Sequence, residues 1–363
     1  MLTSNEVGLS PCPGEPSLYI CLERQLFLLV WVDDLFLFFP KSSSVHATKI
    51  WATLRDNFDL GPWEDLTDML GAVVTRDRAN RRLSVSQKSA FVKLLAKTNM
   101  AECNTAPTPM AAGVDLSRAQ SPSEEERKTM IDMQRAYRSI IATFLYFILW
   151  TRPDLAYAVS RLCRFMHNPG QAHYAALKRL LRYLAGTLDK GLVYDFSKPV
   201  ELHGVHIFID AAHADCPDTK RSTLAAVAFD NDCPLMWDCK RHGSVTTSTN
   251  HSECSATAKG AKMASYIDKI YLHCGFKTKI RPIQCYSDSR GSIAMNYNPL
   301  NRAASRHISI ADHYARETIN SGLITLSHVP TGVMIADALT KPLAATVFQR
   351  HADKLIGDVL KLP

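Results

Sequence analysis

The sequence contains no hydrophobic run long enough to cross a bilayer. The apolar stretch from Leu26 to Phe39 is shorter than the about 20 residues of a membrane-spanning helix, and Asp33 and Asp34 lie at its middle. The ten cysteines form no CxxC pair and no zinc-finger spacing, and the N-terminus lacks the charged-then-apolar pattern of a signal peptide. We therefore expect free thiols in a reducing compartment, the cytoplasm or the nucleus, and no membrane partner.

Length and composition are those of a globular protein with room for more than one core. The chain has 363 residues, of which 46% are hydrophobic, so it is long enough for two or three domains. Its formal net charge of +7 suits an anionic partner without identifying one.

Two adjacent carboxylates interrupt the apolar stretch "LLVWVDDLFLFF", residues 28–39. The stretch is rich in Val, Leu and Phe and ends at Pro40, which predicts two buried strands with Asp33 and Asp34 at the turn between them. Turn chemistry alone would explain one Asp at this place. The other interpretation is a metal-binding pair at a hairpin tip, because a divalent cation offsets the cost of desolvating clustered carboxylates.

A polar segment divides the chain at residues 111–128. It is acidic in its second half and contains Pro122, and the spacing of Ser123 and Glu126 predicts a capping box at the start of a helix. We place a linker there.

The patterns on the two sides of this linker differ. Residues 83–100, before it, predict a short strand and then a helix. Residues 136–186, after it, predict a small bundle of helices. Pro153 lies in the first turn of the second of these helices, and Gly186 ends the third.

Basic side chains gather between Thr151 and Arg182, where Asp154 is the single acid. They are Arg152, Arg161, Arg164, Lys178, Arg179 and Arg182. Such a density suits contacts with nucleic-acid phosphates, and an ordinary solvated helix face is an equally good interpretation of the charge alone.

From residue 200 the pattern changes to strands mixed with helices. The stretches "VHIFID", "LAAVAFD", "LMWDC" and "IQCYSD" predict strands, and a long helix is expected from Ser252 to about Cys274. Four acids stand at the ends of strands or the starts of helices, namely Asp210, Glu253, Asp288 and Asp337. Each position alone also suits turn chemistry or the helix dipole, so their joint meaning depends on whether the fold brings them together.

Several stretches resemble the C-terminal part of the Pol polyprotein of copia-type LTR retrotransposons. They are "VWVDDLFLF", "LGAVVTRDRANRRLSVSQKSAFVKLL", "APTPM", "YRSIIATFLYFILWTRPDLAYAVSRLCRFMHNPGQAHYAALKRLLRYLAGTLDKGLVY", "ASRHISIADHYARE" and "ADALTKPL". The match runs over nearly the whole chain in the family's order, reverse transcriptase and then RNase H. The resemblance implies an α+β multidomain fold with a partial reverse-transcriptase palm, a helical thumb or connection, and an RNase H-like mixed five-stranded sheet with helices.

The resemblance also implies domain boundaries. We expect a truncated palm remnant at 1–110, a linker at 111–135, a helical thumb or connection at 136–197, an RNase H-like domain at 200–345 and a C-terminal helix at 346–363.

The resemblance implies that Asp33 and Asp34 are the palm carboxylates that bind two magnesium ions roughly 4 Å apart. Such polymerases need a further aspartate from an earlier palm strand and the fingers, which belong to upstream sequence, and Trp31 stands where the family has Tyr. We therefore expect a polymerase remnant that is inactive alone.

In the RNase H part, the resemblance assigns four metal-binding and catalytic acids to this chain. "IDAAHA" gives Asp210, "NHSEC" gives Glu253, "SDSRGSI" gives Asp288 and "IADALTK" gives Asp337. The surrounding pattern has drifted, with His213 in place of Trp and Cys254 in place of Tyr.

The resemblance thus implies a ribonuclease H of a reverse-transcriptase polyprotein, with Mg²⁺ or Mn²⁺ as cofactor and RNA–DNA hybrid or duplex nucleic acid as partner. The basic residues between Arg152 and Arg182 would contact the duplex phosphates. Two alternatives stay open: a non-catalytic nucleic-acid-binding protein, and a degenerate gene copy without activity.

Overall fold

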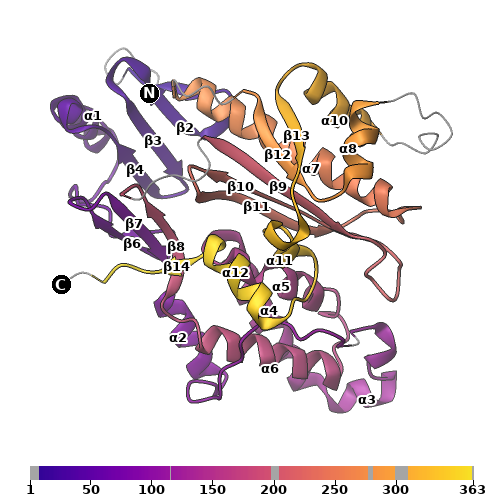
Figure 1. Ribbon diagram of the computed structural model, residues 1–363. Helices are drawn as coiled ribbons and strands as arrows, with labels where there is room; N and C mark the ends of the chain where they lie inside the picture. Colours follow the sequence, from indigo (N-terminus) through magenta and orange to yellow (C-terminus); the bar gives the residue numbers. More distant parts are fainter. Residues whose placement is uncertain (1–7, 115, 198–203, 277–280, 299–309, 362–363) are drawn as a thin grey trace. The chain divides into compact units, whose positions relative to one another are not determined.

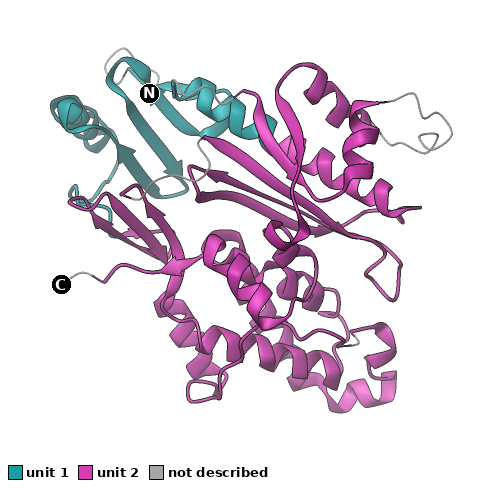
Figure 2. Cartoon of the chain, viewed as in Figure 1, with its two compact units in different colours: residues 1–67, 264–280 teal, residues 68–263, 281–363 magenta. Residues whose placement is uncertain are grey.

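The computed structural model describes residues 8–114, 116–197, 204–276, 281–298 and 310–361. By their contacts they form two compact units, Met1–Thr67 with Ala264–Ile280, and Asp68–Met263 with Arg281–Pro363 (Figure 2). The domain boundaries expected from the sequence stay predictions. The boundary expected near residue 198 and the first part of the motif at residues 304–317 lie outside the described residues.

The first unit is built on an antiparallel sheet of four consecutive strands (Figure 1). These are β1 (Ser10–Cys12), β2 (Glu15–Cys21), β3 (Leu26–Trp31) and β4 (Asp34–Phe38), and helix α1 (Ser44–Asn57) follows them.

The β3–β4 hairpin confirms the two strands and the turn expected here, with Asp33 in the turn and Asp34 as the first residue of β4. Trp31 pairs with Asp34 across a two-residue turn, in which Val32 adopts a positive φ of 52°. Leu26 and Leu28 are fully buried in one core with Leu54 of α1. The expectation of two buried strands is only partly right, because β4 is half-buried along its apolar residues.

Five helices of the second unit lie in the segments expected to be helical, and one of them begins earlier in the sequence than expected. They are α2 (Lys88–Lys97), α3 (Glu124–Thr129), α4 (Ile131–Trp150), α5 (Ala156–Cys163) and α6 (Gln171–Ala185). Ser123 and Glu126 form the expected capping box at α3, and Pro153 lies in a 3-10 turn that leads into α5. Helix α4 begins at Ile131, so it extends into the expected linker.

A mixed five-stranded sheet forms the rest of the second unit's core, in the order β11–β10–β9–β12–β13 (Figure 1). Its strands are β9 (Val205–Ala212), β10 (Thr223–Asp230), β11 (Cys233–Arg241), β12 (Ile283–Ser287) and β13 (Ile324–His328). Strand β10 is antiparallel to β9 and β11, whereas β12 is parallel to β9 and β13. This confirms the α+β class with an RNase H-like mixed sheet.

Alternation along the central strand β9 decides which side chains face which helices. Ile209 meets helix α7 (Thr249–His273), where a Cβ added to Gly260 would lie 2.6 Å from the Ile209 Cγ2 atom. Glycine therefore permits this close approach. Phe208 points to the other face, into a core shared with Leu339 of helix α11 (Asp337–Thr340). Asp210 lies two residues after Phe208 and shares this second face.

The remaining elements complete the second unit. They are helices α8 (Arg290–Tyr297), α10 (Ile310–Asn320) and α12 (Ala345–Leu355), and a second sheet in the order β14 (Gly357–Asp358), β8 (Lys190–Asp195), β7 (Arg82–Ser86), β6 (Ala72–Asp77) and β5 (Asp68–Met69). Within the ranges described above, no helix has the length and apolar character needed to cross a membrane.

Candidate functional site

Asp210 is a buried carboxylate on the central strand of the five-stranded sheet. It is 2% exposed and lies opposite Ala225 of β10. The Thr340 hydroxyl, on α11, donates a hydrogen bond to the Oδ2 atom of Asp210. Such a bond fixes the side-chain rotamer of a group that would otherwise be costly to bury.

Asp288 follows directly after β12, the parallel neighbour of β9. Since Tyr286 lies opposite Phe208 in the register, continuing both strands by two residues brings Asp288 beside Asp210. The Thr331 hydroxyl donates a hydrogen bond of 2.7 Å to Asp288 Oδ2. Asp288 is half-buried, so it gives the group an open side.

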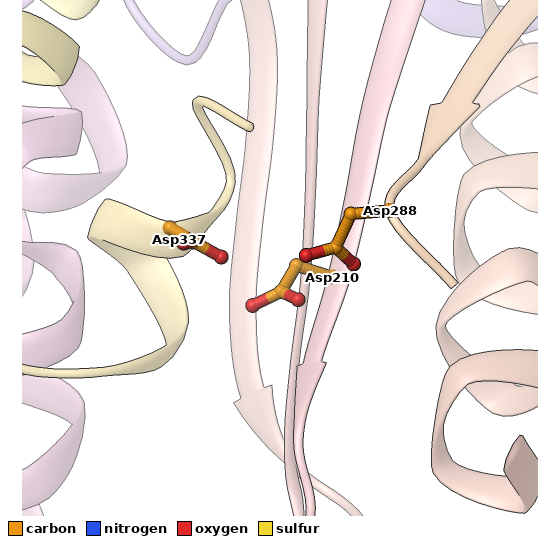
Figure 3. A group of neighbouring side chains, drawn as sticks. All are labelled: Asp210, Asp288 and Asp337. Atoms are coloured by element: carbon orange, nitrogen blue, oxygen red, sulfur yellow. The ribbon is translucent and has the colours of Figure 1, made fainter. Parts of the chain in front are cut away.

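Asp337 is the first residue of α11 and brings the third carboxylate, which is also buried. Oxygens of Asp210, Asp288 and Asp337 all lie within 4.8 Å of one another (Figure 3). Figure 3 shows the short helix presenting Asp337 toward the two aspartates of the strands. Three segments far apart in the sequence thus form one cluster of acids.

Glu253 lies beside this cluster, on α7. Its side chain is 5% exposed, and its Oε2 atom has no hydrogen-bond partner among the described residues. Burial, followed by the charges of Asp210 and Asp288, raises the pKa of Glu253 to about 9. The helix begins at Thr249 instead of the expected Ser252, so Glu253 is its fifth residue.

A lysine partly balances the negative charge of the acids. The Lys341 ammonium lies 2.8 Å from Asp337 Oδ1 and 3.9 Å from Asp210 Oδ2. Burial and the Asp210 charge raise the pKa of Asp337 to about 7, although Lys341 opposes this shift. Without a further cation, the site therefore holds more negative charge than its own residues neutralise.

The donor set fits a hard divalent cation. Oxygen ligands from carboxylates are those that magnesium and related ions prefer. The spacing of the three aspartates permits a shared ion, and the unpartnered buried oxygen of Glu253 is a further donor.

The paired aspartates of the hairpin have different surroundings. Asp33 and Asp34 are exposed at the β3–β4 turn. Among the described residues, no other acid, histidine or cysteine lies close enough to share a metal ion with them. Because both carboxylates are exposed to water, no cation is needed at this hairpin to offset a cost of desolvating them.

The basic residues expected to contact phosphates separate into two sets. Arg152 is fully buried and forms a salt bridge of 2.8 Å with Asp154, so its guanidinium is not available to a ligand. The expectation that Arg152 contacts phosphates is therefore wrong. The sequence shows that Asp154 is the single acid nearby, but it does not show that Asp154 pairs with Arg152. Arg161 and Arg164 are mostly buried and share the carboxylate of Asp215.

The other three basic residues lie on α6 and pair with no acid that the structure describes. Lys178 is exposed, with its ammonium 5.2 Å from the centre of the Tyr174 ring. Arg179 and Arg182 are half-exposed and donate hydrogen bonds to neutral groups, the Thr108 hydroxyl and the carbonyls of residues 104 and 105. Their charges are therefore not cancelled.

The sequence analysis did not identify three residues that contact the acids. Lys341 had a signal, its spacing of four residues from Asp337 at the start of a helix. Thr331 and Thr340 had none, because each hydroxyl reaches an aspartate far away in the sequence.

No protein-family model matches the chain. The Retrovirus-related Pol polyproteins from the transposons RE1 and RE2 of Arabidopsis thaliana are 32% and 31% identical to it, over 96% and 98% of its length. The chain is thus homologous to a part of copia-type retrotransposon Pol polyproteins. It spans 23% of the length of each of these two relatives, so the activities of a whole Pol polyprotein do not transfer to it directly.

One solved structure similar to this chain is that of RNase H1 from Halobacterium salinarum. It is 20% identical, with a TM-score of 0.28, and the match covers 38% of this chain and 93% of that one.

Proposed function

We propose that the second unit is a metal-dependent ribonuclease H, which hydrolyses the RNA strand of RNA–DNA hybrids. The observation that carries this proposal is the meeting of Asp210, Asp288 and Asp337 within 4.8 Å, with Glu253 beside them. The similarity to part of the RE1 Pol polyprotein supports the same reaction class.

Each acid has a defined task in this proposal. Asp210 and Asp288 hold the cation from adjacent strands, Asp337 closes the site from α11, and Glu253 contributes once its proton leaves. A Mg²⁺ or Mn²⁺ ion held by these acids would supply the charge stabilisation and the acidified water that hydrolysis of a phosphodiester needs. Thr340 and Thr331 keep two of the carboxylates in their orientations.

The proposed substrate is recognised by shape and charge. An RNA–DNA hybrid differs from DNA in its A-like minor groove and its 2′-hydroxyls. We assign the phosphate contacts to Lys178, Arg179 and Arg182 of α6, whose charges no described acid cancels. Asp33 and Asp34 belong, in this proposal, to a palm remnant that does not polymerise.

The deciding experiment is cleavage of a labelled RNA–DNA hybrid by the purified full chain. We expect cleavage that requires Mg²⁺ or Mn²⁺ and leaves double-stranded DNA intact. Asp210→Asn and Asp288→Asn should each abolish it while hybrid binding survives, because each removes a metal ligand and neither alters α6.

Asp132→Asn is the matched control, since Asp132 is exposed on α4 and lies outside the cluster. This variant should cleave like the unaltered chain. Tight hybrid binding without any metal-dependent cleavage by the unaltered protein would instead favour a non-catalytic nucleic-acid-binding protein.

A further inference from the structure

A cavity of about 380 Å³ lies in the second unit, and its lining includes none of the four acids of the cluster. The five-stranded sheet supplies one wall with His206, Phe208, Phe229 and Tyr286. The segment 329–335 supplies a second wall and helix α12 a third. The volume is within the range of about 300–1,000 Å³ that small-molecule sites occupy.

The wall on the sheet consists of flat rings. The His206 ring lies parallel to that of Phe229, with an interplanar angle of 8° and centroids 5.5 Å apart. The rings of Phe208 and Tyr286 are tilted by 31°, with centroids 5.1 Å apart. Flat apolar walls of this kind favour a planar ligand, because stacking adds to the gain from removing apolar surface from water.

Helix α12 adds one buried polar atom that has no partner. His351 lines the cavity and is 2% exposed, and its Nε2 atom has no hydrogen-bond partner in the described chain. Burial lowers the pKa of His351, so its imidazole is neutral at pH 7, with one nitrogen that donates and one that accepts. A ligand hydroxyl can satisfy Nε2 in either tautomer, because a hydroxyl both donates and accepts.

The charged residues of the lining favour an uncharged ligand. Asp232 places a carboxylate there, and Arg350 and Lys354 bring two cations. Asp232 and Lys354 each already interact with another group of the protein, and Arg350 donates a hydrogen bond of 3.5 Å to the Gly332 carbonyl. The carboxylate opposes an anionic ligand and the two cations oppose a cationic one, whereas an uncharged ligand meets neither repulsion.

We propose that this cavity binds an uncharged planar molecule of two fused aromatic rings that carries a hydroxyl. The fused rings lie against the aromatic wall of the sheet, and the hydroxyl forms a hydrogen bond with His351 Nε2. A ring system without a polar group would leave Nε2 without a partner, and a non-planar alcohol would lose the stacking. The inference does not depend on the proposed nuclease activity, because none of the residues that carry it is one of the acids.

Calorimetric titration of the full chain with 2-naphthol, at pH 7 in EDTA, tests this binding without bound metal. We expect saturable binding with a dissociation constant below about 1 mM. Decahydro-2-naphthol keeps the hydroxyl but not the planar rings, and 2-naphthoate is an anion, so each should bind at least about tenfold more weakly. Absence of 2-naphthol binding, or equal affinity for either analogue, would overturn the proposal.

Variants then locate the site. Val333 lines the cavity and is 52% exposed, so Val333→Trp should fill the cavity without disturbing the core and should abolish 2-naphthol binding. His351→Phe keeps a ring but not its nitrogens, and should weaken binding about five- to tenfold while thermal unfolding shows an intact fold. Val45→Trp, at an exposed valine of α1 outside the cavity, is the matched control and should bind 2-naphthol unchanged. Unaltered affinity in both cavity variants would contradict the assignment.

Discussion

The ammonium of Lys341 lies 2.8 Å from the carboxylate of Asp337, four residues earlier in the chain. It also lies 3.9 Å from Asp210, so one lysine faces two of the three clustered aspartates. A divalent cation that binds these acids must share their negative charge with this ammonium. The positive charge of Lys341 therefore opposes the binding of a divalent cation at this site.

Removing this ammonium should strengthen metal binding. We expect Lys341→Met to bind Mn²⁺ about tenfold more tightly at about pH 8.5, because a positive charge close to the incoming cation is lost. Lys341→Arg keeps the charge and should resemble the unaltered protein. Electron paramagnetic resonance of free Mn²⁺ gives both affinities, and equal affinity in the Met variant would show that Lys341 does not oppose the metal.

The pH dependence of stability should reveal the buried acids. The pKa of Glu253 is raised to about 9 and that of Asp337 to about 7, so the metal-free folded state holds protons that the unfolded state has released. Stability should fall as pH rises from about 5 to about 9, whereas below about pH 4 both states are protonated and this penalty is absent.

Thermal unfolding in EDTA across this pH range measures the effect. Glu253→Gln cannot ionise, so its melting temperature should fall less with pH than that of the unaltered chain. Added Mn²⁺ should raise the melting temperature more at the alkaline end, where the ligands are deprotonated. Parallel pH profiles for the variant and the unaltered chain would contradict the burial of a protonated Glu253.

Local patterns predicted much of what surrounds the site. The strand that carries Asp210 and the Ser123 capping box both depend on residues close together in the sequence, where periodicity and spacing are informative. The hairpin at Asp33 was predictable for the same reason. The four acids were singled out by the resemblance to the Pol polyproteins and not by these local patterns.

Long-range pairing accounts for what the sequence could not predict. The hydrogen bond from Thr340 to Asp210 joins residues 130 positions apart, and no local signal marks either partner for the other. Strand β13 lies at the edge of the five-stranded sheet, and the sequence analysis did not predict it. Counting charges placed Arg152 at a surface, although its buried salt bridge makes it part of the core.

Breaking that buried salt bridge should destabilise the second unit. Arg152 donates to Asp154, which also accepts a hydrogen bond from the Tyr183 hydroxyl. Arg152→Met leaves a buried, uncompensated carboxylate and should cost about 3–5 kcal/mol in the free energy of urea unfolding. Arg135→Met, at an exposed pair with Asp132, should cost less than about 1 kcal/mol. A small, equal effect of both substitutions would show that the Arg152 pair is not structural.

The hairpin carboxylates should not support polymerisation by this chain. Asp33 and Asp34 are exposed, and no third described acid shares a metal-sized group with them. A primed RNA template with Mg²⁺ and all four nucleotides should therefore show no extension. Template-dependent extension that Asp33→Asn abolishes would overturn the assignment of this segment as a remnant.

The basic face of α6 should control the salt dependence of duplex binding. Each phosphate that a protein neutralises releases about 0.9 of a counterion, so log affinity falls linearly with log salt. Replacing Lys178, Arg179 and Arg182 together by Ala should flatten that slope by up to about three units if each makes one phosphate contact. Fluorescence anisotropy with a labelled hybrid, over a series of salt concentrations, measures the slope.

The choice of these three residues depends on their partners within the fold. Arg179 and Arg182 donate only to neutral groups in their described hydrogen bonds and so keep their full charge, whereas Arg161 and Arg164 share Asp215. Lys97→Ala removes one exposed charge from α2 and should leave the slope within error. If the triple variant of α6 also leaves the slope unchanged, its basic side chains form only a solvated face, and the duplex must bind elsewhere.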